Sequence, residues 1–107
     1  MSDPVLGLIG IARKGGHLVI GREAVRQTLR KGRVRVLVVA SDAGEALIRE
    51  MGHLSNGGEP PLVPGPPREL IGRICGRDEV SVVAITDTGL AAAVIRSAAA
   101  SGTQSAR

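Results

Sequence analysis

The feature that most constrains the fold is a nearly continuous run of β-branched and other apolar residues from Val34 to Ala40. A strand with one face in solvent alternates apolar and polar residues, so this run predicts a central strand covered on both faces. Three further apolar runs, 18–20, 62–63 and 80–85, alternate with segments of helical periodicity. The alternation predicts an α/β fold. We expect a three-layer α/β/α sandwich with a small mixed, mostly parallel four-stranded sheet.

The ends of the helices are marked by capping residues, prolines and glycines. We expect helices to begin at Asp3-Pro4, at Arg22, at a capping box of Asp42 with Glu45, at Pro66-Pro67, and at Thr86-Asp87-Thr88. The short run between prolines at Leu62-Val63 is expected at a sheet edge. Residues 1–100 are predicted to form a single domain, and the small, polar residues 101–107 a disordered tail.

The composition excludes several classes of function. Cys75 is the only cysteine, so no disulfide can form within the chain, and we expect a buried thiol. His17 and His53 lack partners at ligand spacing, which argues against a metal site. No nucleophile, base and orienting group stand together, so we expect no enzyme, no cofactor and no small-molecule substrate.

The sequence also bears on location. No apolar run approaches the roughly 20 residues that span a bilayer. The first residues lack the order of a signal peptide. We therefore expect a cytoplasmic protein without a membrane partner.

Positive charge is concentrated in one segment. Residues 13–35 hold eight of the 14 basic residues and one of the ten acids, a net +7 in a chain whose total is +4. A solvated helix face usually mixes signs, whereas clustered basic charge is typical of a polyanion-binding protein. Phe, Tyr and Trp are absent, so bases cannot stack on aromatic side chains. Contacts to a nucleic acid would come from Arg, Lys, backbone amides and aliphatic groups.

The entrance to the second helix is the candidate site. Gly21 precedes the helix, whose N-terminal N–H groups and dipole favour a phosphate. Arg22, Arg26 and Arg30 are spaced four apart, so they share one helix face. Arg13 and Lys14 end the preceding helix and could lie beside this point, and His17 could contact a phosphate or a base.

Two blocks of sequence carry a family resemblance. The first is GHLVIGREAVR, residues 16–26, followed by Gly32 and the strand to Asp42; the second is Ile74-Cys75-Gly76, a loop of three residues, and residues 80–87. Together they resemble the kink-turn-binding ribosomal protein superfamily (the L-seven-Ae, L-thirty-e, S-twelve-e and Gadd-forty-five group), in particular its small bacterial YlxQ-like members. The resemblance extends from Val5 to about Ile95.

The resemblance implies non-catalytic binding of structured RNA, a kink-turn or a related bent RNA, ribosomal RNA included, and an association with the ribosome or with translation. Contacts with sheared G·A pairs and the bent backbone would fall on one group of residues: Gly21, Arg22, Glu23 and Arg26, supported by Lys14 and His17. An extruded base would pack on the loop after the fourth helix, through Arg77, Val80 and Ser81. The alternative is a protein–protein adaptor on the same fold without RNA specificity.

Overall fold

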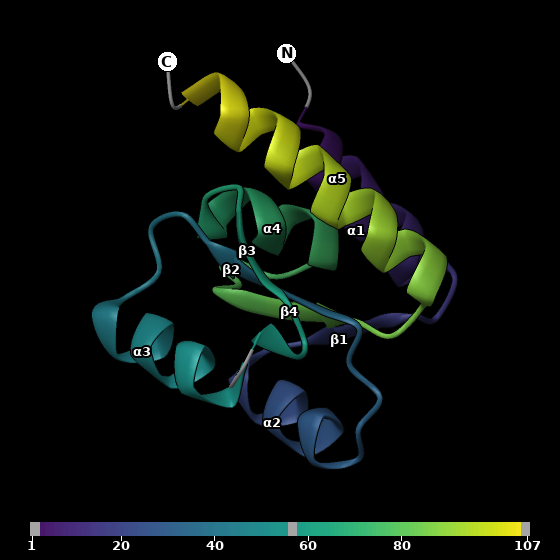
Figure 1. Cartoon of the computed structure of the whole chain (residues 1–107), viewed down its shortest axis with the longest axis vertical. Coiled ribbons are helices and arrows are strands. Elements are labelled where there is room, and N and C mark those ends of the chain that lie inside the picture. The colour runs from purple at the N-terminus through teal and green to yellow at the C-terminus, as the bar shows by residue number, and fades with distance from the viewer. Residues whose placement is uncertain (1–2, 56–57, 106–107) are drawn as a thin grey trace.

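The computed structural model describes residues 3–55 and 58–105, in which helices and strands alternate along the chain (Figure 1). The elements are α1 (Pro4–Lys14), β1 (Leu18–Ile20), α2 (Arg22–Arg30), β2 (Val36–Ala40), α3 (Glu45–Leu54), β3 (Leu62–Gly65), α4 (Arg68–Cys75), β4 (Val82–Ile85) and α5 (Thr88–Ser105). The strands form one sheet in the order β1-β4-β2-β3. Helices α1, α4 and α5 lie on one side of the sheet, and α2 and α3 on the other (Figure 1). The three-layer sandwich and the mixed four-stranded sheet are confirmed.

The sheet is less parallel than expected. Only β2 and β3 are parallel, whereas β4 pairs antiparallel with both β1 and β2. The cause lies in the connection between β3 and β4. Gly65 ends β3 beside Ala40, and Val82 begins β4 beside Val39, at the same end of the sheet. Helix α4 therefore does not carry the chain back to the other end, and β4 runs in the reverse direction. Sequence alternation alone does not reveal such a return.

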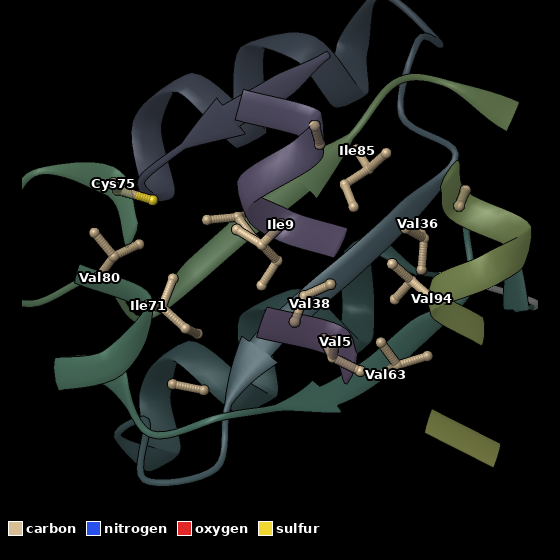
Figure 2. Packing of buried hydrophobic residues seen from close by; sticks show 14 residues of the cluster. Val5, Ile9, Val36, Val38, Val63, Ile71, Cys75, Val80, Ile85 and Val94 are labelled. Atoms are coloured by element: carbon tan, nitrogen blue, oxygen red, sulfur yellow. The ribbon is translucent and has the colours of Figure 1, made fainter. Parts of the chain in front are cut away.

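The central strand is buried along its whole length, as predicted, because both faces of the sheet carry an apolar core. Alternate residues of β2 face opposite cores: Val36, Val38 and Ala40 lie in the core under α1, α4 and α5 (Figure 2), and Leu37 and Val39 in the core under α2 and α3. Cys75 belongs to the first core, as expected of a buried thiol, and burial raises its pKa.

Helix capping agrees with prediction at two positions and differs at a third. Asp3 Oδ1 accepts from Val5 N at 2.9 Å, and Asp87 Oδ2 from Leu90 N at 2.9 Å. Asp42 does not cap α3, which begins after Gly44. The chain turns instead, with Ala43 N donating to the Ala40 carbonyl at 3.1 Å.

Asp42 serves a different helix. Its Oδ1 accepts from Arg68 N at 2.8 Å, at the start of α4. The two preceding residues are prolines, which have no N–H, so Arg68 carries the first amide in need of an acceptor. Asp42 therefore joins two segments that lie 26 residues apart in the chain, and does not cap the helix that follows it.

The remaining elements bear on the limits of the domain. Strand β3 lies at an edge of the sheet, as predicted for a run between prolines, and Pro64 is part of it. Helix α5 continues to Ser105 and so enters the predicted tail. Residues 106–107 lie outside the described residues, and the disordered tail stays a prediction. None of the helices in the described part of the chain is long and apolar enough to cross a membrane.

Candidate nucleic-acid interface

The junction between β1 and α2 is built around Gly21. This residue has φ 94° and ψ 158°, a conformation that is essentially restricted to glycine. Its N–H donates to the Val82 carbonyl at 3.0 Å, which ties the junction to β4, and its carbonyl accepts from Val25 N at 3.0 Å. No side chain caps the helix here. The N–H groups of the first turn of α2 therefore have no partner within the helix, and a bound phosphate would satisfy them.

A cavity of about 340 Å³ opens beside this junction. Three segments form its walls: the start of α2, the start of α3 and the connection from α4 to β4. The lining residues are Gly21, Arg22, Gly44, Leu47, Arg77, Glu79, Val80, Ser81 and Val82. A Cβ built on Gly21 would lie 3.8 Å from Arg77 Nη1, so the Arg77 guanidinium lies beside the entrance of α2. The structure thus brings together the two sequence blocks that carry the family resemblance.

Backbone packing fixes the connection from α4 to β4. A Cβ on Gly72 would lie 2.7 Å from the Asp78 carbonyl oxygen, so only glycine allows the loop to cross α4 this closely. Arg77 N donates to the Gly72 carbonyl at 2.8 Å, and Val80 N donates to the Arg68 carbonyl at 3.0 Å. These contacts hold Arg77 at the cavity without relying on its own side chain.

Arg22 and Arg26 share an acidic partner on α3. Arg22 Nε lies 2.9 Å from Glu50 Oε1, and Arg26 Nε donates to Glu50 Oε2. Arg26 Nη1 also donates to Glu23 Oε1 at 2.7 Å. The hydrogen bond from Arg26 lowers the pKa of Glu50, and the same bond raises the pKa of Arg26. The sequence alone does not indicate Glu50 as part of the site, because nothing in the spacing of α3 shows that this carboxylate faces α2.

The contacts with Glu50 restrict the orientation and reduce the net charge of the basic face of α2. Arg22 and Arg26 are oriented by α3 rather than free in solvent, and part of their charge is balanced by Glu50 and Glu23. Arg22 still lines the cavity and keeps 46% of its side chain exposed. A phosphate at the junction would therefore meet one guanidinium from each side, Arg22 and Arg77.

Two predicted site residues lie away from the junction. The His17 carbonyl accepts from Thr86 N at 3.0 Å, at the opposite end of β1 from Gly21. Four residues of extended chain separate the two, a distance of about 13 Å. Lys14 is exposed at the end of α1, before the turn that leads to His17. Neither residue lines the cavity.

Two further residues have structural contacts that limit their role. Val80 lines the cavity but is only 5% exposed, since it belongs to the core. Arg13 Nη1 donates to the Ile74 carbonyl at 3.1 Å, so this guanidinium caps the end of α4 just before Arg77.

Known proteins resemble this one over most of its length. A model of the family described as ribosomal protein L7Ae/L30e/S12e/Gadd45 matches residues 3–95. Over 88 residues the chain is 31% identical to the RNA-binding protein YlxQ of Bacillus subtilis, covering 82% of this chain and 85% of that protein.

Two solved structures share the fold. One is a Bacillus halodurans protein of unknown function, with a TM-score of 0.83 and 24% identity over 90% of this chain and 97% of that one. The other is the 15.5kD RNA binding protein of Giardia lamblia, with a TM-score of 0.76 and 16% identity over 91% and 86% of the two chains.

Proposed function

The chain belongs to the ribosomal protein L7Ae/L30e/S12e/Gadd45 family, in agreement with the resemblance of its two sequence blocks, and on this premise we propose that it binds structured RNA at the β1–α2 junction. One observation carries the proposal: the open N-terminus of α2, Arg22 and the Arg77 guanidinium meet at one cavity. Backbone amides, a helix dipole and two cations at one point are a suitable environment for phosphate.

The geometry favours a bent RNA over a straight one. A sharp bend brings phosphates of one strand close together, and the junction offers cationic groups from two walls of the same cavity. The floor of the cavity is nearly closed, since Leu47 is 7% and Val82 1% exposed, so an extruded base would pack mainly on the exposed Arg77 side chain at the rim. Ser81 provides a hydroxyl that can donate to or accept from a base edge. A kink-turn has the required bend and exposed bases.

The acidic residues near the junction have a role in this proposal. Glu23 follows Arg22 in the first turn of α2, and Glu79 lines the cavity. A carboxylate repels phosphate but accepts hydrogen bonds from base amino groups. Glu23 and Glu79 would therefore favour an orientation in which base edges, and not phosphates, face them. This selects for the shape of the RNA rather than for charge alone.

The proposal also includes the cellular setting. We propose that the protein acts with ribosomes or in translation, in the cytoplasm, as the family resemblance implies. Sedimentation of a cell lysate tests this directly. The protein should travel with ribosomal particles at low salt and leave them at high salt. A protein found only in fractions without RNA would contradict the cellular role.

A filter-binding titration tests the molecular function. We expect a kink-turn RNA to bind more tightly than a straight duplex of equal length, with an affinity that falls steeply as salt is raised. Arg77→Gln should weaken binding about ten- to a hundredfold, because charged hydrogen bonds contribute about 1.5–3 kcal/mol.

Arg73→Gln is the matched control, since Arg73 lies on α4 four residues before Arg77, has 70% of its side chain exposed and does not line the junction cavity. Its affinity should stay within about twofold of the wild type, as for other exposed positions. Equal affinity for bent and straight RNA would exclude kink-turn specificity. The absence of salt-sensitive binding to either RNA would exclude the function itself.

A further inference from the structure

A second group of cations lies at the other end of α2. Arg30 is the last residue of the helix, and Lys31, Arg33 and Arg35 follow it before β2. All four are exposed. We call this group the α2 end surface. Arg30 follows Gly21 by nine positions of helix, about 13 Å along the axis. Arg35 N donates to the Ile85 carbonyl at 2.8 Å, which places it at the end of the sheet opposite the junction (at the right in Figure 1).

The α2 end surface holds four of the six cations of the basic segment, residues 13–35, that form no ion pair with another described residue. Within residues 3–55 and 58–105, none of its four cations forms an ion pair, whereas Arg22 and Arg26 share Glu50. The helix dipole favours cations at a C-terminus, which accounts for Arg30 and Lys31. It does not account for Arg33 and Arg35, which lie beyond the helix. Four neighbouring cations repel one another, and a polyanion relieves that repulsion.

A cavity of about 480 Å³ adjoins the surface. Arg26, Arg30 and Arg35 contribute cationic groups to its lining, and Glu59 is the one carboxylate among the lining residues. Leu54, 37% exposed, is the exposed large apolar side chain at this site. Protein interfaces usually have an apolar centre that is depleted of charge. Leu29, Val34 and Pro60 also line this cavity, so its floor is apolar, but the four exposed cations of the α2 end surface favour a phosphate backbone over a protein partner.

We propose that the α2 end surface binds the backbone of the helical stem that leaves the bend of the same RNA. This inference rests on the proposed function, because it requires RNA at the junction. Double-stranded DNA carries about one phosphate charge per 1.7 Å of its axis, so an RNA stem of similar charge density running along α2 would present about eight charges over 13 Å. RNA held at Gly21 would therefore reach Arg30 and Arg33 with its phosphates. The junction recognises the bend, and the α2 end surface adds affinity that depends on stem length.

The test uses the full chain and two kink-turn RNAs that differ only in the length of the stem along α2. The double variant Arg30→Gln/Arg33→Gln should bind the long-stem RNA about tenfold more weakly, and its salt slope should fall by about one to two, as expected for one or two lost phosphate contacts. Binding of the short-stem RNA should change by less than about twofold. Both substituted residues are exposed, so the thermal midpoint should stay close to that of the wild type.

The matched control is Arg49→Gln/Arg96→Gln, which removes the same charge from exposed positions on α3 and α5. If the control weakens long-stem binding as much as the test variant, the effect is one of net charge and the inference is wrong. An equal loss on both RNAs would also overturn it. A protein that is captured after nuclease treatment and lost with the test variant would assign the surface to a protein partner instead.

The variant Arg77→Gln distinguishes a failure of the α2 end surface from a failure of RNA binding at the junction. If Arg77→Gln weakens both RNAs while the double variant weakens neither, the proposed function stands and the α2 end surface has no role. If Arg77→Gln has no effect on either RNA, the proposed function itself fails.

Discussion

At the scale of single residues, Gly21 determines whether the junction can form. A side chain at this position would not clash with its neighbours, because a Cβ built on Gly21, whose φ is 94°, would lie 3.8 Å from the nearest atom, Arg77 Nη1. The constraint is the backbone conformation itself, which L-residues avoid. There is thus room for a side chain at position 21, and only the backbone strain opposes one.

We expect Gly21→Ala to lower the free energy of unfolding by about 1–3 kcal/mol, because the strained backbone has to be kept or the junction rebuilt. Urea titration followed by far-ultraviolet circular dichroism measures this. Gly52→Ala is the control: Gly52 lies within α3 with no atom within 4 Å of an added Cβ. It should gain about 0.5–1 kcal/mol from helix propensity. A neutral Gly21→Ala would show that the junction tolerates a different backbone.

The sequence predicts single residues well where local rules apply. The roles of Gly21, Asp3 and Asp87 follow from glycine conformation and helix capping, and the structure agrees. Glu50 and Asp42 could not be assigned in this way. Their partners lie 24 and 26 residues away in the chain, on elements whose relative rotation no local pattern specifies. Arg77 could be assigned to the site only through the family resemblance.

At the scale of elements, the contact between α2 and α3 depends on the ionisation of Glu50. Its pKa in the folded state lies below 4.5, because Arg26 and Arg22 favour the carboxylate. A carboxyl group whose pKa is lowered by folding stabilises the fold at any pH above the pKa that it has in the unfolded chain. That contribution disappears as the pH falls through the pKa of the group in the folded state. The contact is therefore complete at neutral pH and weakens as the pH falls below 4.5 toward the lower pKa of the folded state.

Glu50→Gln should reduce the thermal midpoint at neutral pH, where it leaves Arg22 and Arg26 without their shared carboxylate. Below pH 4.5 the difference between variant and wild type should shrink, because the wild-type carboxyl group becomes neutral too. Melting curves across this range measure the effect. Glu45→Gln, an exposed acid on the same helix with no ion pair to another described residue, controls for net charge. A difference that persists unchanged in acid would contradict the ion-pair explanation.

The order of the elements along the chain could be predicted, but the order of the strands in the sheet could not. Strand β4 lies between β1 and β2, and a hydrophobic run in the sequence does not indicate which strands it will pair with. The deciding features are physical contacts: Gly72 lets the following loop cross α4, and Asp42 fixes the start of α4. Both depend on residues that meet only in the folded chain.

At the scale of the whole molecule, the two cores share their strands. Leu37 points into the core under α2 and α3, and the adjacent Val38 into the core under α1, α4 and α5. Loss of β2 would therefore expose both cores at once. The two outer layers should unfold together rather than one after the other.

Leu37→Ala should cost about 2–5 kcal/mol, the usual range for a fully buried leucine. Hydrogen exchange of the slowest amides in α1 and α2 measures whether both layers lose the same protection, although Leu37 contacts only one core. Leu62→Ala, at an edge position that is 36% exposed, should cost far less. Protection lost in α2 alone would show that the layers are independent.

The edge position of β3 also limits how molecules of this protein meet one another. An open edge strand offers unpaired N–H and C=O groups to a neighbouring chain, and is a common starting point for aggregation. Pro64 lies within β3 and has no N–H to offer, and further prolines flank the strand at positions 61 and 66. Sheet growth from this side is therefore interrupted at the backbone itself, which should help the free protein remain dispersed at high concentration.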